Sequence, residues 1–200
     1  MNKFLIGLVL SLTASTLVYA AGDAAAGKEK AASCGGCHGA DGNSALGLFP
    51  KIAGQNVKYL MNQLTAIKYG KRVVVEMTGQ LDNKNEQDLE DLAAYYASQT
   101  IVGGKTAADQ FELGQKIYRA GIPAKQVAGC MACHGAKGQG LASAGFPMLG
   151  GQHSDYTEKQ LKSFRLMTRN NDPNQMMRNI ASRLSDVEIK AVASYIQGLY

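Results

Sequence analysis

Residues 34–38 read Cys34-Gly35-Gly36-Cys37-His38, and residues 130–134 repeat the pattern as Cys130-Met131-Ala132-Cys133-His134. This CxxCH pattern is the attachment site of c-type haem. Its spacing lets two thiols each add to a vinyl group of one haem, and the adjacent imidazole then lies against the iron as the proximal ligand. The two copies use all four cysteines and two of the three histidines. The sequence therefore predicts two covalently attached haem c groups, each with its iron.

Two other uses of a CxxC pair fit this chain less well. A redox disulfide of the thioredoxin type would need a surrounding βαβ pattern, which the sequence lacks. A zinc site made of the four cysteines would leave both following histidines unexplained. Because the five-residue pattern occurs twice with no cysteine left over, haem attachment is the better interpretation.

The N-terminus has the pattern of a secretory leader. Lys3 supplies the positive charge, residues 4–17 are largely apolar, and residues 18–20 end on the small residue Ala20. The apolar run is short for a membrane span, although an uncleaved anchor is the alternative. We expect residues 1–20 to be a signal peptide that is cleaved near Ala20. Export to the periplasm agrees with the haem prediction, because c-type haem is attached outside the bacterial cytoplasm.

The rest of the chain is a tandem duplication. Cys34 corresponds to Cys130 at an offset of 96 residues, and Pro50 corresponds to Pro147 at an offset of 97. Other pairs at the offset of 97 are Gln55 and Gln152, Gln63 and Gln160, and Arg72 and Arg169. Each half is small enough for a covalently held haem to supply much of its apolar centre. We therefore expect a first domain over residues 21–100, a linker over 101–107 and a second domain over 108–200.

The coarse secondary structure is the same in both halves. Helical segments lead into the haem motifs at 24–32 and 109–119, and apolar stripes predict further helices at about 56–69 and 154–167. An irregular loop and a last helix follow in each half, with Asn85 as a cap in the first and Ser185 with Glu188 as a capping box in the second. Residues 73–75 are the only β-like run, and it is short. The fold class is all-α, with each domain wrapped around one haem.

Charge is distributed unevenly between the halves. Residues 22–103 hold 8 basic and 9 acidic residues, whereas residues 104–200 hold 12 basic and 7 acidic ones. The respective net charges are thus −1 and +5. No basic run with interleaved aromatic residues is present, so we expect no nucleic-acid partner. The asymmetry instead indicates a surface suited to docking with protein partners.

A six-coordinate iron needs a distal ligand in each half. The remaining histidine is His153, but it has no histidine partner in the repeat, because Asn56 occupies the matching place. Methionine is the other candidate, and Met/His ligation raises the reduction potential and suits electron transfer.

The repeat chooses among the methionines. Met77 lies 18 residues before Tyr95, and Met177 lies 18 residues before Tyr195. The repeat therefore selects Met77 and Met177 as distal ligands, with Met176 as the alternative in the second half. On the proximal side, we expect a backbone carbonyl in the loop of Pro50 or Pro147 to accept a hydrogen bond from the proximal imidazole and orient it. The alternative is that each proline only stiffens a turn.

The order helix, CxxCH, proline loop, helix, methionine loop and final helix is that of class I cytochromes c. Two fused copies of it, with FPKIAGQ at 49–55 and FPMLGGQ at 146–152, resemble the dihaem cytochrome c4 family. Segments 91–97 and 176–200 also look like that family, and the resemblance covers essentially the whole mature chain. It implies two tandem class I cytochrome c domains. It implies that thioethers form at Cys34, Cys37, Cys130 and Cys133. The implied proximal ligands are His38 and His134, and the implied distal ligands are Met77 and Met177.

Members of that family are periplasmic electron carriers that are often loosely membrane-associated. The resemblance implies transfer of single electrons from a quinol-oxidising complex, quinol–cytochrome c reductase, to a terminal oxidase or another acceptor. We expect an electron carrier and not an enzyme, because both axial positions of each iron are filled. The alternatives are a haem subunit of a larger dehydrogenase, such as a flavocytochrome, and a dihaem peroxidase, which would need an iron that can open.

Overall fold

The computed structural model describes residues 22–199, so the predicted signal peptide lies outside the described residues. Within this range the chain forms helices joined by loops, and its only β-type pairings are two isolated bridges, Ile122 to Val127 and Leu141 to Phe146. The all-α prediction is therefore confirmed. No helix in the described range is both long and apolar enough to cross a membrane.

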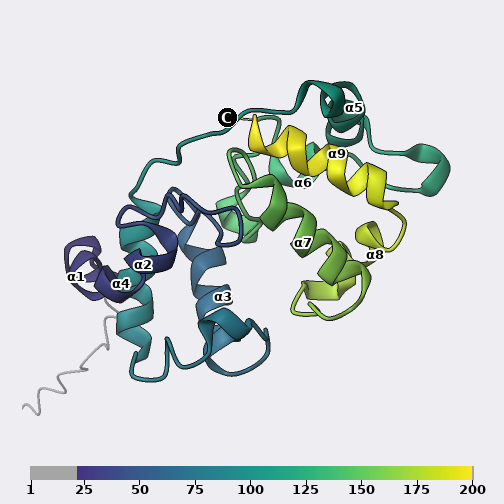
Figure 1. Ribbon diagram of the computed structural model, residues 1–200. Coiled ribbons are helices and arrows are strands. Elements are labelled where there is room, and N and C mark those ends of the chain that lie inside the picture. Colours follow the sequence, from purple (N-terminus) through teal and green to yellow (C-terminus); the bar gives the residue numbers. More distant parts are fainter. Residues whose placement is uncertain (1–21, 200) are drawn as a thin grey trace, which may run out of the picture.

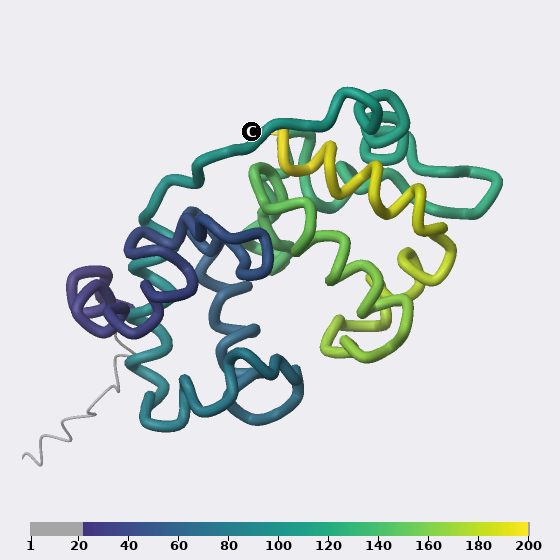
Figure 2. The backbone as a smooth tube through the Cα atoms, viewed as in Figure 1, coloured from purple at the N-terminus to yellow at the C-terminus, as the bar shows by residue number. Residues whose placement is uncertain are grey.

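The chain forms two helical halves side by side, as Figures 1 and 2 show. Both follow the predicted order of a leading helix, a one-turn CxxCH helix, a long helix and a final helix. The α-helices of the first half are α1 (Ala24–Lys30), α2 (Gly35–His38), α3 (Val57–Lys68) and α4 (Glu86–Ala97). Those of the second half are α5 (Phe111–Ala120), α6 (Met131–His134), α7 (Ser154–Arg165), α8 (Met176–Ala181) and α9 (Asp186–Gln197).

The helix starts follow from local sequence signals. The Asn56 side chain accepts a hydrogen bond at the start of α3 from the backbone N–H of Tyr59 at 2.8 Å. Asn85 and Asp88 form a reciprocal capping box at α4, and Ser185 and Glu188 form one at α9. These side chains satisfy N–H groups that have no partner within the helix. Both predicted caps of the final helices are confirmed.

In each half the leading helix crosses the final helix at a glycine. A Cβ atom on Gly27 of α1 would lie 2.0 Å from the Asp91 carbonyl oxygen of α4. A Cβ atom on Gly114 of α5 would lie 2.3 Å from the Ala191 carbonyl oxygen of α9. Only glycine lets the two backbones approach this closely. The two crossings hold each CxxCH helix at a fixed place beside the core.

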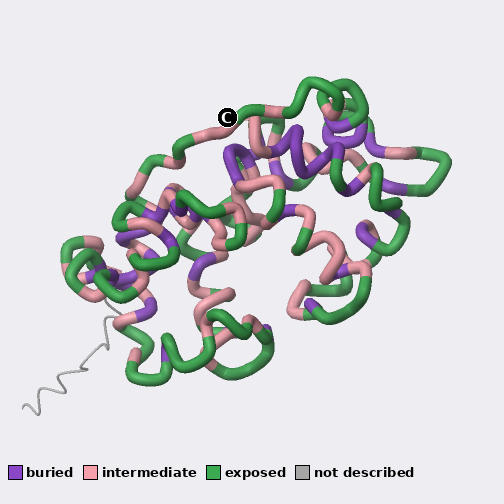
Figure 3. The backbone as a smooth tube through the Cα atoms, viewed as in Figure 1, coloured by how far each residue is buried: buried purple, intermediate pink, exposed green. Residues whose placement is uncertain are grey.

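The core of each half is built mainly on its final helix. Figure 3 shows buried segments along α9 and in the region of α4. Leu89, Leu92 and Ala93 of α4 are at most 1% exposed, and so are Ile189 and Val192 of α9. These apolar side chains are removed from water and stabilise each half.

The linker is attached to both halves. The Val102 backbone N–H donates to Asn43 Oδ1 of the first half at 2.8 Å. The Gly104 backbone N–H donates to the Gln197 carbonyl of the second half at 3.0 Å. The Lys51 ammonium also donates to the Val102 carbonyl oxygen. These contacts fix the position of the linker, which runs over the top of the molecule in Figure 1.

Two local expectations differ from the structure. The second methionine loop was expected to be irregular, but it contains helix α8, Met176–Ala181. The β-like run at residues 73–75 forms no strand: Val73 and Val75 are 78% and 77% exposed, and Val75 starts a 3-10 turn that ends at Met77. Without a neighbouring strand to pair with, β propensity alone does not make a sheet.

Candidate haem-binding sites

A large cavity of about 1770 Å³ is lined by both halves of the molecule. Ligand pockets usually measure about 300–1,000 Å³, so this space accommodates two groups of cofactor size. Its walls include every residue predicted to bind haem or iron, together with the alternative ligand: Cys34, Cys37, His38, Met77, Cys130, Cys133, His134, Met176 and Met177. The fold therefore brings the predicted residues of each half to one common space.

The histidine of each CxxCH motif is oriented by the proline loop that follows it. His38 Nδ1 lies 2.9 Å from the Pro50 carbonyl oxygen, and His134 Nδ1 lies 2.9 Å from that of Pro147. A carbonyl oxygen can only accept, so Nδ1 carries the hydrogen and Nε2 keeps its lone pair for a metal ion. The predicted orienting role of the two proline-loop carbonyls is confirmed.

Burial and an aromatic ring complete the surroundings of both imidazoles. The ring centroids of Phe49 and His38 are 6.4 Å apart, and those of Phe146 and His134 are 6.3 Å apart. Burial lowers the pKa of both histidines, although the proline hydrogen bond opposes the effect. Both imidazoles are therefore neutral at pH 7, as a ligand to iron must be.

The cysteines occupy equivalent places in the two motifs. In each, the first cysteine is half-buried and the second is exposed. The backbone N–H of His38 donates to the Cys34 carbonyl at 2.9 Å, and that of His134 donates to the Cys130 carbonyl at 2.9 Å. One helical turn thus carries both thiols and the imidazole along the cavity wall. Within residues 22–199, no three His, Cys, Asp or Glu side chains form a group that could hold a metal ion.

Met77 is half-buried at the end of a short 3-10 turn and lines the cavity. Its neighbour Glu76 forms an ion pair with Lys159 of the second half at 3.0 Å. Backbone hydrogen bonding, together with the hydrogen bond from Lys159, holds the pKa of Glu76 below its usual value, so the carboxylate is charged at pH 7. The methionine loop of the first half is thereby attached to α7 of the second.

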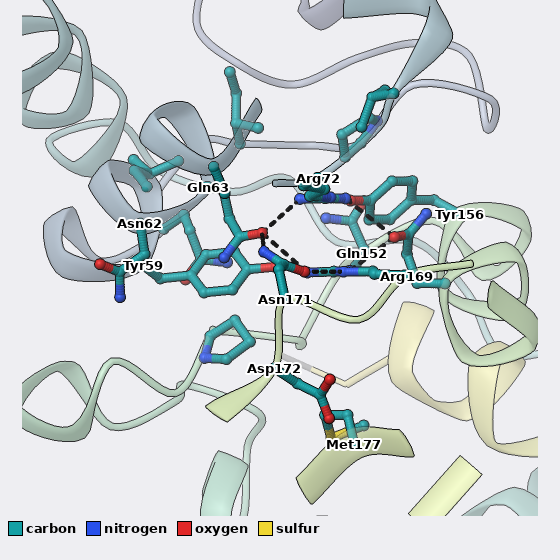
Figure 4. A pocket seen from close by; sticks show the side chains of 18 of the residues that line it. Tyr59, Asn62, Gln63, Arg72, Gln152, Tyr156, Arg169, Asn171, Asp172 and Met177 are labelled. Carbon is teal, nitrogen blue, oxygen red and sulfur yellow. Dashed lines mark hydrogen bonds between the residues drawn. The ribbon is translucent and has the colours of Figure 1, made fainter. Parts of the chain in front are cut away.

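Met177 lies on the first turn of α8, close to Asp172 in Figure 4. The Arg178 guanidinium donates to Asp172 at 2.7 Å, and the Arg178 backbone N–H donates to the same carboxylate at 3.0 Å. The two residues before Met176 have positive φ values of 52° and 58°, a conformation that non-glycine residues adopt only where their surroundings require it. Met177 is half-buried, whereas Met176 is 39% exposed, which favours Met177 as the cavity-facing residue.

His153 is engaged at the interface between the halves. Its Nε2 lies 2.8 Å from the Ser44 carbonyl oxygen of the first half. This contact occupies one of its two ring nitrogens, and His153 is absent from the residues that line the cavity. The third histidine thus joins the two halves.

Tyr96 has, among the described residues, the one buried side-chain polar atom without a hydrogen-bond partner. Tyr96 is 3% exposed, packs in the cluster that contains Cys34 and lines the cavity. Buried hydroxyl groups almost always have a partner. An unsatisfied hydroxyl beside a CxxCH cysteine fits a site that is completed by a bound group. The residue equivalent to Tyr96 in the second half is Ile196, which is apolar and buried.

The halves contact each other through pairs of equivalent residues. Gln55 Oε1 accepts from the Met148 backbone N–H at 2.8 Å, and Gln55 Nε2 donates to the Met148 carbonyl at 2.9 Å. Gln152 makes the same two bonds with Lys51, at 2.9 and 2.7 Å. Contacts in which equivalent residues exchange roles show an approximate two-fold relation between the halves.

A second symmetric contact, which we call the arginine cluster, joins α3 and α7 (Figure 4). Arg72 donates to Gln63 of its own half at 2.9 Å and to Gln160 of the other half at 3.0 Å. Arg169 donates to Gln160 at 2.7 Å and to Gln63 at 3.2 Å. Two tyrosine hydroxyls accept from the arginine of the other half, at 2.9 and 3.0 Å. The six members of the arginine cluster are Tyr59, Gln63, Arg72, Tyr156, Gln160 and Arg169.

Two of these pairs are visible as repeats in the sequence, but the repeat alone assigns them no role. Arg72 with Arg169, and Gln63 with Gln160, share the offset of 97, and Tyr59 with Tyr156 has the same offset. The signal was therefore present as a set of polar repeats on a long helix and in the loop that follows it. A repeat shows which residues are equivalent, but only the structure shows that the equivalent residues face one another.

Two CxxCH helices in a duplicated all-α fold, each with an oriented neutral imidazole at a shared cavity, define a dihaem c-type cytochrome. The family model for cytochrome c matches residues 24–100 and 111–200. Cytochrome c4 of Pseudomonas aeruginosa is 51% identical over the full length of both chains. The chain belongs to the cytochrome c4 family.

Solved structures and more distant relatives agree with this assignment. The crystal structure of reduced recombinant cytochrome c4 from Pseudomonas stutzeri superposes with a TM-score of 0.89 at 47% identity, covering 90% of this chain and 100% of that chain. A thiosulfate dehydrogenase electron acceptor of Stutzerimonas stutzeri is 35% identical and covers 82% of this chain and 78% of its own. The protein is thus an electron carrier, not an enzyme, with two covalent haem c groups.

Proposed function

We propose that the protein is a periplasmic carrier that accepts single electrons from quinol–cytochrome c reductase and passes them to a terminal oxidase or another acceptor. When bound, the two haem groups supply the one-electron ferrous/ferric couple. The observation that carries this proposal is the duplicated site, in which each half lines one cavity with two cysteines, an oriented imidazole and a methionine. Two redox sites held together in one protein suit electron transfer.

Each residue type has a distinct task in this proposal. The cysteines of each motif, Cys34 with Cys37 and Cys130 with Cys133, form the thioethers. His38 and His134 are the proximal iron ligands, each held by its proline carbonyl at 2.9 Å. Met77 and Met177 are the distal ligands. With the methionine sulfur and the histidine nitrogen both bound to the iron, the site would keep substrates from it and would favour a high potential.

The proposal includes the organisation of the chain and its location. Residues 1–20 are removed as a signal peptide near Ala20, and the domains cover residues 21–100 and 108–200 with a linker at 101–107. The mature protein works in the periplasm, with peripheral membrane association. Support comes from the N-terminal charge and apolar pattern of the sequence and from the contacts that attach the linker to both halves.

The redox partners are proposed to be proteins that recognise charge. The net charges of −1 and +5 on the two halves favour orientation of a partner by long-range electrostatics. One relative is named as an electron acceptor of thiosulfate dehydrogenase. We therefore propose thiosulfate dehydrogenase as the second electron donor to test. Reduction rates with quinol–cytochrome c reductase and with thiosulfate dehydrogenase, measured at low and high salt, would rank the two donors.

Carbon monoxide binding tests the proposed distal ligands. Met77→Ala and Met177→Ala should each create one haem that binds carbon monoxide in the reduced state, because each removes the sulfur from one iron. The absorption spectrum reports the binding, and the haem count per chain shows that attachment is intact. Met176→Ala is the matched control, since Met176 lies next to Met177 and is exposed.

Three outcomes would contradict the assignment. Binding of carbon monoxide by the parent protein would show an open iron and favour an enzyme. Binding by Met176→Ala, with none by Met177→Ala, would exchange the two residues. Fewer than two attached haems in the parent, expressed in a host competent in c-type haem maturation, would refute the proposed cofactor sites.

A further inference from the structure

Asp172 is a buried carboxylate in the loop that leads to Met177. Its side chain is 5% exposed, and it lines the same cavity as Met177. One carboxylate oxygen accepts from the Arg178 guanidinium at 2.7 Å, and the other accepts from the Arg178 backbone N–H at 3.0 Å. The carboxylate therefore binds both the side chain and the backbone of the residue that directly follows Met177.

The contact with the backbone takes the place of a helix cap. Gln175 precedes α8, but its side chain makes no capping hydrogen bond. The Arg178 N–H belongs to the first turn of α8, where N–H groups have no partner within the helix. Asp172 supplies an acceptor from outside the helix, and its negative charge is favourable at this helix end. Because Met177 lies in the same turn, the contact also fixes the Met177 backbone.

The segment between Asp172 and α8 depends on its surroundings for its conformation. Asn174 and Gln175 have φ values of 52° and 58°. Left-handed backbone at residues other than glycine persists only where the neighbouring structure enforces it. The Asp172 backbone carbonyl accepts from the Gln175 N–H at 3.4 Å, and its carboxylate binds Arg178 beyond the segment. Asp172 thus closes this loop through both its backbone and its side chain.

The methionine loop of the first half is held in a different way. Met77 ends a 3-10 turn, and the next α-helix begins only at Glu86. The ion pair between Glu76 and Lys159 attaches this loop to the other half, and its two side chains are 37% and 49% exposed. Exposed ion pairs contribute little to stability. The second half therefore has a buried local contact at its methionine, and the first half has an exposed contact between the halves.

We propose that Asp172 is a positioning residue for the distal ligand Met177. It holds the first turn of α8 so that the methionine side chain stays in the cavity, and it acts on the iron of the second half alone. This inference rests on the proposed haem sites. Without the carboxylate, the loop is free to leave its left-handed conformation, and Met177 moves with it. The second iron then opens to an external ligand, whereas the first iron does not.

The test measures methionine ligation in the full haem-loaded protein. The near-infrared band of a ferric haem bound to sulfur reports the methionine ligands, and carbon monoxide binding by the reduced protein reports an open iron. Asp172→Ala removes both carboxylate contacts, so one haem should lose its sulfur band and bind carbon monoxide. Asp172→Asn keeps an oxygen for the Arg178 N–H but loses the negative charge. It should lose less of the band than Asp172→Ala.

Asp186→Asn is the matched control. Asp186 also pairs with an arginine, Arg165, but its side chain is 67% exposed. The control should keep the sulfur band of the parent and bind no carbon monoxide. If Asp172→Ala does not attach two haems, the comparison of Asp172→Asn with Asp186→Asn decides. An equal band in those two variants would overturn the proposal, and so would a lower melting temperature of Asp172→Ala with an unchanged band.

Double variants identify the haem on which Asp172 acts. Added to Met177→Ala, Asp172→Ala should open no further haem, because the sulfur that it positions is already gone. Added to Met77→Ala, it should open the second haem. The reverse pattern would overturn the proposal. A missing sulfur band in the parent would instead refute the distal ligands of the proposed function, so the two failures are distinguishable.

Discussion

Gly114 is the position where a single methyl group should disturb the second domain most directly. The glycine lies on α5 where this helix crosses α9. A Cβ atom there would lie 2.3 Å from the Ala191 carbonyl oxygen and 2.6 Å from Tyr195 Cβ. The carbonyl oxygen is part of the α9 backbone, and the Cβ atom is bonded directly to it, so no side-chain rotation relieves the clash. Gly114→Ala must therefore push the two helices apart.

The size of the effect follows from two opposing contributions. Overpacking of a well-packed core costs about 1–3 kcal/mol, and a clash with backbone belongs near the upper end of that range. Alanine recovers about 1 kcal/mol of helix propensity relative to glycine. The net expected loss is about 2 kcal/mol of unfolding free energy, combining overpacking with propensity. For a domain of this size, it corresponds to a fall of roughly 8–16 °C in the melting temperature.

The assay is thermal unfolding of the haem-loaded protein, followed by circular dichroism after the haem count has been checked. Gly36→Ala is the control, because a Cβ on Gly36 would meet nothing within 4 Å. Gly36 lies in the CxxCH helix α2, so the control should match the parent or gain up to about 1 kcal/mol in unfolding free energy. If Gly114→Ala remained within about 0.5 kcal/mol of the parent, the close-crossing argument would be refuted.

Three further predictions concern the charge, interface and haem surroundings. The hydrogen bond from Lys30 holds the pKa of Asp91 at about 2, below its ordinary 3.8. The pair therefore stabilises the fold above pH 4, and this stabilisation is lost as the pH falls toward 2. In an acid-unfolding titration, Asp91→Asn should lack this pH-dependent loss of stability. Gln152→Ala removes two hydrogen bonds to the Lys51 backbone and should cost about 1–3 kcal/mol in unfolding free energy, measured with denaturant. Tyr96→Phe removes a donor beside one haem and should lower only that haem's potential in a redox titration, whereas a shift in both would contradict its local role.

The features that could be predicted from the sequence have short-range causes. The CxxCH spacing places two thiols and an imidazole on one helical turn whatever the surrounding fold is. Asn85 and Ser185 mark helix starts because their side chains bond N–H groups only three residues away. The proline carbonyls were predictable because Pro50 and Pro147 recur at almost the same distance from their histidines.

The features that could not be predicted do not follow from helix caps, motif spacing or propensity. Helix α8 forms where Asp172 binds Arg178 and two residues adopt positive φ, and no local propensity signals this. The arginine cluster needs the two halves to face each other, which a repeat alone does not specify. The contact of His153 could not be predicted, because its partner, the Ser44 carbonyl, lies 109 positions away.

The contrast between the interface and the outer surface bears on how the carrier works. The central contacts of the approximate two-fold interface pair residues of the same type, Gln55 with Gln152 and Arg72 with Arg169. The outward surfaces are under no such constraint, and the net charges of the halves differ by six, from −1 to +5. A partner that recognises charge therefore distinguishes two domains whose internal sites are nearly alike. The symmetric contacts between the halves hold the two haem sites together in one protein.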